Sequence, residues 1–161
     1  MSQGFVRRTR EEFDFSRAKV FRKRAPLAKA NVEVAARRQS VVTTVDGLEE
    51  TRSVAEPGDR IVTGARGERY VIKAQKFDAL YEEDAADPSR YRSKTLVRAL
   101  PLKEDTELRA PWDEWQRAKK GGFVVQRIGA PDDVYLIAES VFKATYAPEP
   151  GRASRQKRHA R

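Results

Sequence analysis

Two stretches of this sequence resemble each other, and this internal similarity constrains the fold more than any other feature. Residues 57–81 and 121–146 share aromatic and aliphatic positions at a nearly constant spacing. At an offset of 65 the matched positions are Tyr70 and Tyr135, Ile72 and Ile137, Phe77 and Phe142, Ala79 and Ala144, and Tyr81 and Tyr146; at an offset of 63 they are Gly58 and Gly121, and Val62 and Val125. The two-residue difference falls in a polar, glycine-containing turn, where an insertion is tolerated best. The similarity predicts two tandem copies of one unit.

Each stretch has the pattern of a β-hairpin closed by a short helix. In the first, residues 60–63 and 69–73 are predicted strands on either side of the turn 64–67. Phe77 and Tyr81 are four residues apart, so they share one side of a helix that covers the hairpin. The second stretch repeats this plan with strands over 123–126 and 133–137 and with Phe142 and Tyr146. We expect these aromatic side chains to form core rather than to stack on a ligand.

Further elements are predicted in the flanking residues. Asp46-Gly47 lies between β-favouring runs over 40–45 and 48–54, which is a strong hairpin signal. The corresponding region of the second stretch, residues 106–115, carries both tryptophans. Thr9 and Glu12 fit a capping box, which predicts a short helix around Arg10–Lys19. The aromatic-basic stretches 21–24 and 91–94 are candidate starts of the two copies, and the acidic stretch 82–90, with Pro88, is a candidate linker.

The predicted fold class is α+β and β-dominated: two tandem, related, small β-rich units with basic terminal arms. A unit of roughly 65 residues has a marginal core on its own, so we expect the two units to pack together. The predicted division is a basic N-terminal arm over 1–24, a first unit over 25–86, a second, diverged unit over 87–149 and a disordered basic tail over 150–161.

The net charge of +9 is concentrated at the two ends of the 161-residue chain. Residues 1–24 carry +5 and residues 151–161 carry +5, so the intervening residues carry −1. A solvated tail without a dedicated partner and a tail that contacts a polyanion both fit this distribution. The candidate polyanion contacts in the tail are Arg152, Arg155, Lys157, Arg158 and Arg161.

Composition excludes several classes of chemistry. Without cysteine there is no disulfide, thiolate nucleophile or Cys-type metal site. The only histidine, His159, lies in the basic tail, so histidine-based acid/base catalysis and multi-histidine metal sites are not expected. No Gly-x-Ser-x-Gly motif is present. We therefore expect no enzyme, no cofactor and no metal site, and we name no catalytic residue.

No apolar run is long enough to cross a membrane, and the N-terminus lacks the apolar region of a secretory signal. These features predict no membrane partner and a cytoplasmic protein, in a bacterial cell or a phage-infected host.

The first stretch resembles the PGDYG family of small phage and bacterial proteins. The resemblance rests on Pro57-Gly-Asp59, Ile61-Val-Thr-Gly64, Gly67-Glu68 and Tyr70, followed by Phe77 and Tyr81. Arg60 stands where the family usually has an aromatic residue, and the second stretch has Lys120-Gly-Gly122 in place of Pro-Gly-Asp. The resemblance implies a fold and no particular activity.

Two groups of residues are candidate binding sites. Asp59 and Glu68 are motif carboxylates, which either meet across the hairpin as a cation or acid/base site or stabilise turns locally. Arg66 lies in the glycine-containing turn, which is a weak candidate phosphate loop. Trp112 and Trp115, with Arg117, Lys119 and Lys120, form either a stacking surface or part of the core.

The function predicted from these features is a non-enzymatic binding or interaction module. Its partner is either nucleic acid or another polyanion, contacted without sequence preference through the basic ends, or a protein. The alternative is a phage or bacterial protein that binds or sequesters a small ligand such as a nucleotide or a metal. The sequence leaves the oligomeric state open.

Overall fold

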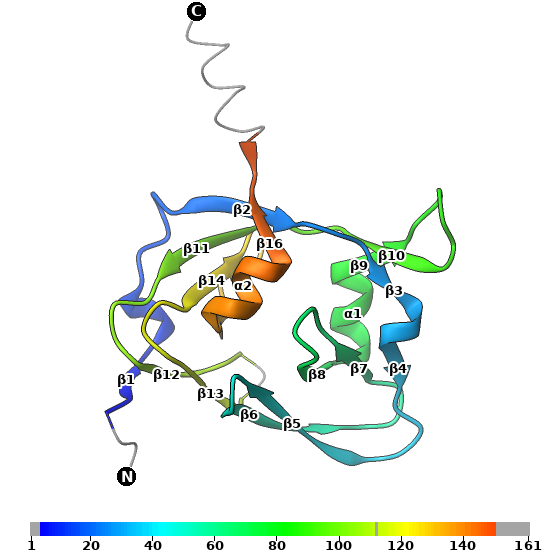
Figure 1. Cartoon of the computed structure of the whole chain (residues 1–161), viewed down its shortest axis with the longest axis horizontal. Helices are drawn as coiled ribbons and strands as arrows, with labels where there is room; N and C mark the ends of the chain where they lie inside the picture. The colour runs from blue at the N-terminus through cyan, green and yellow to red at the C-terminus, as the bar shows by residue number, and fades with distance from the viewer. Residues whose placement is uncertain (1–3, 112, 151–161) are drawn as a thin grey trace, which may run out of the picture.

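The computed structural model describes residues 4–111 and 113–150, and short strands dominate it (Figure 1). The first elements are β1 (Val6–Arg8), η1 (Arg10–Glu12), β2 (Lys19–Lys23), β3 (Leu27–Ala28), η2 (Lys29–Asn31), β4 (Val32–Val34), β5 (Gln39–Val45), β6 (Leu48–Ala55), β7 (Arg60–Thr63), β8 (Arg69–Ile72), α1 (Ala74–Leu80) and β9 (Tyr81–Glu83). They are followed by β10 (Arg90–Ser93), β11 (Val97–Pro101), β12 (Thr106–Arg109), β13 (Trp115–Ala118), β14 (Phe123–Arg127), β15 (Val134–Ile137), α2 (Glu139–Thr145) and β16 (Tyr146–Pro148). The predicted β-dominated class is confirmed.

These elements form two lobes. The first lobe consists of the sheets β4-β7-β8 and β3-β10-β9, the hairpin β5-β6 and helix α1. The second lobe consists of the sheets β15-β14-β11-β2-β16 and β1-β12-β13 and helix α2. Helices α1 and α2 face each other across the middle of the molecule, and the hairpin β5-β6 runs below them (Figure 1). Strand β6 of the first lobe contacts β13 of the second.

The hairpins and short helices predicted from the sequence are present. Strand β7 covers the predicted residues 60–63, and α1 follows directly after β8. Strands β14 and β15 and helix α2 repeat this order in the second lobe. The turn between β5 and β6 has positive φ angles at Asp46 (50°) and Gly47 (81°), as a tight two-residue hairpin requires.

The positions matched by the sequence repeat have corresponding neighbours. Val62 pairs with Tyr70 in the first lobe, as Val125 pairs with Tyr135 in the second. The rings of Phe77 and Tyr81 stack with centroids 5.1 Å apart, and those of Phe142 and Tyr146 do the same at 5.1 Å. A third ring stands edge-on to each pair, from Tyr91 in the first lobe and from Phe21 in the second.

The predicted N-terminal arm is instead part of the second lobe. Strand β2 lies between β11 and β16, where Phe21 pairs with Val97 and Lys23 pairs with Tyr146. Of the predicted helix around Arg10–Lys19, only the single turn Arg10–Glu12 forms. Residues 13–18 are irregular with a turn at Ser16–Arg17, and β2 begins at Lys19. The pairing of β2 with two neighbouring strands is a long-range effect that a local capping signal does not report.

Strand β10 has the equivalent position in the first lobe. It lies between β3 and β9, where Tyr91 pairs with Leu27 and Ser93 pairs with Tyr81. The sequence suggests residues 91–94 as the start of the second copy and places the second unit at 87–149, whereas the structure pairs β10 (Arg90–Ser93) with strands of the first lobe. The predicted linker is the loop between β9 and β10, in which the carboxylates of Asp84 and Asp87 accept hydrogen bonds from backbone N–H groups two residues later.

Each lobe has its own hydrophobic clusters. One cluster of the first lobe contains the matched residues Val62, Ile72, Phe77 and Tyr81, with Leu27, Tyr70 and Tyr91 packed against it. The corresponding cluster of the second lobe contains Val97, Val125, Phe142 and Tyr146, with Phe21, Tyr135 and Ile137 packed against it. The aromatic side chains of the repeat therefore contribute to the core. Within residues 4–111 and 113–150, no helix has the length and apolar character needed to cross a bilayer.

Candidate functional site

The two motif carboxylates lie at opposite ends of the β7-β8 hairpin. Asp59 accepts hydrogen bonds from the backbone N–H groups of Glu56 (2.9 Å) and Ala74 (3.1 Å) and from the Lys73 ammonium (3.0 Å). Burial opposes the charge of this carboxylate, but these three donors outweigh burial and lower its pKa below the usual value. Asp59 therefore ties the Pro-Gly turn to the start of α1.

Glu68 stabilises the turn at the other end of the same hairpin. Its carboxylate accepts a hydrogen bond from the backbone N–H of Arg66 (2.9 Å) and packs against Gly64, where a Cβ atom would collide with it. The Arg66 guanidinium pairs with Asp46 at 3.4 Å on the surface. The structure does not bring Asp59 and Glu68 together, so the acid/base pair considered from the sequence has no geometric basis.

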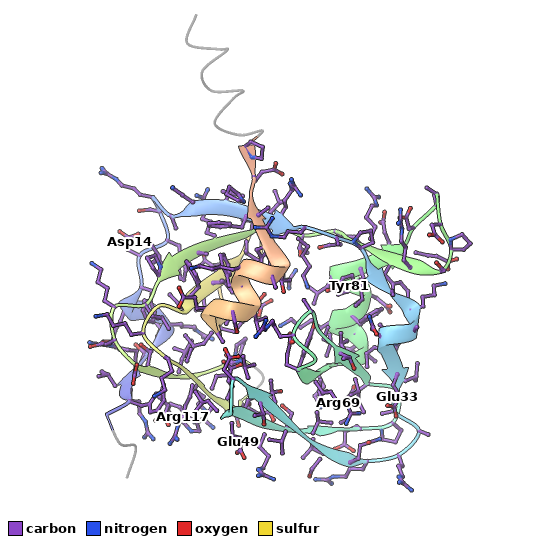
Figure 2. The ribbon with its side chains drawn as sticks, in the orientation of Figure 1. Asp14, Glu33, Glu49, Arg69, Tyr81 and Arg117 are labelled. Atoms are coloured by element: carbon purple, nitrogen blue, oxygen red, sulfur yellow. The ribbon has the colours of Figure 1, made fainter. Side chains whose placement is uncertain are left out.

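The predicted tryptophan surface is partly described. Trp115 is 40% exposed, and the Arg7 guanidinium lies 4.2 Å from its ring centroid. Two basic neighbours are paired with carboxylates: Arg117 with Glu107 at 3.1 Å, and Lys119 with Asp105 at 3.8 Å. Asp105 also accepts a hydrogen bond from the backbone N–H of Lys120. In Figure 2 Arg117 lies at the periphery of the molecule, well away from Tyr81. Trp112 lies outside the described residues, as do the predicted polyanion contacts from Arg152 to Arg161.

A cavity of about 390 Å³ lies between the two lobes. Its walls include four tyrosines at matched positions, Tyr70 and Tyr81 from the first lobe and Tyr135 and Tyr146 from the second. Aliphatic side chains complete much of the lining: Ile72, Leu80, Leu136, Ile137 and Val141. This volume and this largely apolar, aromatic lining are typical of small-molecule sites.

Lys23 faces this cavity from the end of β2. Its ammonium donates a hydrogen bond to the Tyr81 hydroxyl (2.5 Å) and lies 5.1 and 5.7 Å from the ring centroids of Tyr81 and Tyr146. Burial favours the neutral amine, but the hydroxyl groups of Tyr146, Tyr70 and Tyr81 counteract burial and raise the pKa of Lys23 above its usual value. The cavity therefore contains a positive charge held by hydroxyl groups and aromatic faces.

Glu50 enters the cavity from a β-bulge. In the β5-β6 hairpin Thr43 pairs with Thr51 and Thr44 pairs with Glu49, so Glu50 is the extra residue of the longer strand. A bulge turns a side chain away from the alternation of a regular strand. Glu50 lines the cavity and makes no hydrogen bond or ion pair with any residue that the structure describes. Burial, reinforced by the charges of Glu68 and Asp46, raises its pKa to about 8.

Thr51 and Glu114 add further polar groups to the cavity wall. Thr51 is 8% exposed, and its Oγ1 is a buried side-chain atom with no hydrogen-bond partner among the described residues. Burial raises the pKa of Glu114, although a hydrogen bond from Ser53 opposes the shift. A buried hydroxyl without a partner costs free energy unless a hydrogen-bonding group, such as one on a ligand, occupies the space beside it.

Polar contacts between the lobes surround the cavity. The Lys76 ammonium of α1 pairs with Asp133 of the second lobe at 2.8 Å, and Asp133 also pairs with Arg127 at 2.8 Å. The Ser140 hydroxyl of α2 donates a hydrogen bond to Asp46 of the first lobe at 2.7 Å. These contacts link α1 to the second lobe and α2 to the first lobe.

A second concave feature is a basic groove of about 330 Å³ at the ends of β2 and β10. Its lining includes the cations Arg22, Lys23, Arg24, Arg92 and Lys94, and a single acidic residue, Glu149. Lys23 lines both this groove and the cavity. The groove lies where the chain passes from one lobe into the other.

The sequence alone does not indicate the cavity, because Lys23 and Glu50 become neighbours of the tyrosines only through long-range strand pairing. The one available signal was the match between residues 21–24 and 91–94, which places Lys23 and Ser93 at equivalent positions. Within the part of the chain that is described, no cluster of three or more His, Cys, Asp or Glu side chains is arranged to hold a metal ion. Comparison with protein families, with curated proteins and with solved structures finds no match to this chain.

Proposed function

We propose that this protein binds a small organic molecule, without transforming it, in the cavity between its two lobes. The observation that carries the proposal is a 390 Å³ cavity whose wall contains two polar groups, Glu50 and Thr51, without a hydrogen-bond partner among residues 4–111 and 113–150. In a folded protein buried polar groups are normally paired, so such groups beside an empty space are what a ligand site presents. This is the small-ligand alternative considered from the sequence, extended to organic ligands in general.

The proposal includes the tandem-unit interpretation. The two lobes are related units, and each contributes two tyrosines at matched positions to the cavity wall. The supporting observations are the corresponding pairings of β2 with β16 and of β10 with β9, and the matching aromatic clusters. In this interpretation each unit contributes one wall of the site, and ligand sites are common at the boundary between two units.

A fragment screen by ligand-observed NMR on the full chain tests the binding proposal. Val141→Trp fills part of the cavity, because Val141 is a half-buried residue of its lining. Val34→Trp is the matched control, since Val34 is 57% exposed and does not line the cavity. We expect fragments that bind the wild type and Val34→Trp but not Val141→Trp. A screen without any such fragment overturns the proposal.

The basic groove supports a second candidate function, contact with a polyanion. Arg22, Arg24 and Lys94 form no ion pair with any acidic residue that the structure describes, whereas Arg92 pairs with Glu82. Uncompensated cations in a groove attract phosphate backbones, and the attraction falls with salt. In this second candidate function, the groove joins the tail residues considered from the sequence as a surface for polyanion contact.

Fluorescence anisotropy with a labelled single-stranded oligonucleotide tests the second candidate. The double variant Arg22→Gln/Arg24→Gln removes two charges of the groove, and Lys103→Gln removes an exposed charge outside it. We expect the affinity of the wild type for the oligonucleotide to fall as the salt concentration rises. The double variant should bind more weakly, with a smaller dependence of affinity on salt, and Lys103→Gln should bind nearly as the wild type does. Equal effects of the two variants contradict a role for the groove.

A further inference from the structure

Glu50 is the group in the cavity whose charge is least compensated. Glu68 and Asp46 are the acidic groups whose charges act on Glu50. Glu68 is already engaged with the backbone of Arg66, and Asp46 pairs with Arg66 and Ser140. The lysines of the lining also have partners: Lys23 contacts Tyr81, Lys73 contacts Asp59, and Lys76 contacts Asp133. Glu50 thus faces two acidic neighbours, and none of the described lysines of the lining pairs with it.

A second, independent feature lies beside it. Thr51 Oγ1 is buried, lines the same cavity and has no partner in the described residues. Its hydroxyl can accept a hydrogen bond from a ligand. The Glu50 carboxylate, which the bulge directs into the cavity, and Thr51 Oγ1 are therefore two neighbouring hydrogen-bond acceptors. A nitrogen that donates several hydrogen bonds, such as an ammonium group, suits both.

We propose that the cavity binds an organic cation, a small molecule whose protonated amine or amidine group contacts Glu50 and Thr51 while its apolar body lies among the tyrosine rings. This inference rests on the proposed ligand-binding function and specifies its ligand class. The tyrosines contribute because the faces of aromatic rings attract cations as well as apolar groups. Lys23 occupies the faces of Tyr81 and Tyr146, so Tyr70, which lines the same cavity, is the ring that we assign to the bound cation.

Binding of such a cation must displace a proton. In the free protein Glu50 is largely protonated at neutral pH, because burial and the charges of Glu68 and Asp46 raise its pKa. The other titratable groups that line the cavity are Glu114, Tyr70, Tyr81, Tyr135, Tyr146, Lys23, Lys73 and Lys76. A bound ammonium group favours the carboxylate form, so affinity rises with pH until Glu50 is ionised in the free protein as well.

Three probes of similar size and different charge test the inference: benzylamine, benzyl alcohol and benzoate. We expect benzylamine to bind the wild type most tightly, with an affinity that rises about tenfold or more between pH 6 and pH 8. Calorimetry in two buffers with different ionisation enthalpies reports the proton released. Glu50→Gln should weaken benzylamine about tenfold, in line with the value of a hydrogen bond to a charged group, and should leave benzyl alcohol nearly unchanged.

Glu49→Gln is the matched control, because Glu49 is the neighbouring residue of the same strand, is exposed and pairs with Arg52 (Figure 2). It should leave all three affinities unchanged. The cation inference is overturned if benzyl alcohol, benzoate or another fragment enters the cavity while benzylamine does not. It is also overturned if Glu50→Gln leaves benzylamine binding unchanged. In both cases the proposed binding function stands. If no compound shows binding that Val141→Trp abolishes, both are overturned.

Discussion

At the scale of single residues, the cavity depends on side chains that the surrounding backbone holds in unusual positions. The bulge between Thr43 and Thr44 turns Glu50 inward, and its partial burial next to Glu68 makes ionisation costly. Asp133 represents the opposite situation, because it is 7% exposed but contacts both Arg127 and Lys76. One carboxylate weakens the fold when it ionises and the other holds the lobes together.

The pH dependence of stability should change when Glu50 is replaced by glutamine. The folded-state pKa of Glu50 is raised from 4.5 to about 8, so its protonated form supports the fold below pH 4.5. This contribution is lost as the pH rises through 8, because the folded protein must then ionise a buried group. Urea unfolding should therefore find Glu50→Gln more stable than the wild type at pH 8.5 and equally stable near pH 4. An equal difference at both pH values would contradict this origin.

Replacing Asp133 by asparagine should destabilise the protein by about 2 kcal/mol, because two charged donors lose a buried carboxylate partner. Denaturant unfolding at neutral pH measures the change. Asp132→Asn is the control, since Asp132 is an exposed neighbour whose ion pair with Arg10 is long, at 3.8 Å. Equal, small effects of the two substitutions would show that the contact between the lobes does not contribute to stability.

At the scale of elements, the hairpins and short helices could be predicted from the sequence because their signals are local. Strands β7 and β8 and helix α1 follow from a β-branched run, a glycine turn and two aromatic residues four apart. Strand β2 could not be predicted this way, because Phe21 becomes a strand residue through pairing with Val97, far along the chain. The bulge at Glu50 could not be predicted either, because it depends on the register between β5 and β6, and the sequence of each strand by itself gives no sign of a bulge.

Matched core positions in the two hairpins should respond alike to substitution. Val62 and Val125 are each 0% exposed and pair with Tyr70 and Tyr135. Val62→Ala and Val125→Ala should each cost about 2 kcal/mol, from two lost methyl groups and the space that they leave. Val42→Ala, at a position that is 36% exposed, should cost much less. Denaturant unfolding compares the three variants, and a large difference between the two buried positions would argue against equivalent packing of the hairpins.

At the scale of the whole molecule, the two lobes are symmetric in their aromatic framework and asymmetric in their polar groups. Tyr70 and Tyr81 are matched by Tyr135 and Tyr146 in the cavity wall. Lys23, however, is matched by Ser93, and Asp59 is matched by Gly122 at the offset of 63. The matched apolar and aromatic positions thus occupy similar surroundings in the two lobes, whereas the polar positions differ, and Lys23 is a charge that only one lobe brings to the cavity at this position.

Because β2 pairs with two strands from distant parts of the chain, we predict that residues 1–24 are required for the fold. Strand β2 hydrogen-bonds to β11 on one side and to β16 on the other, and Phe15 and Ala18 join the buried cluster around Leu108. A chain that starts at Ala25 leaves two strand edges and this cluster uncovered, and the small net stability of a typical domain makes such a loss severe. We expect it to lose cooperative thermal unfolding in circular dichroism. A chain that ends at Pro150 keeps β1 to β16 and should melt like the full chain. If the chain starting at Ala25 also melts cooperatively at that temperature, β2 is an accessory strand after all, and the pairing that places Lys23 in the cavity is not essential to the fold.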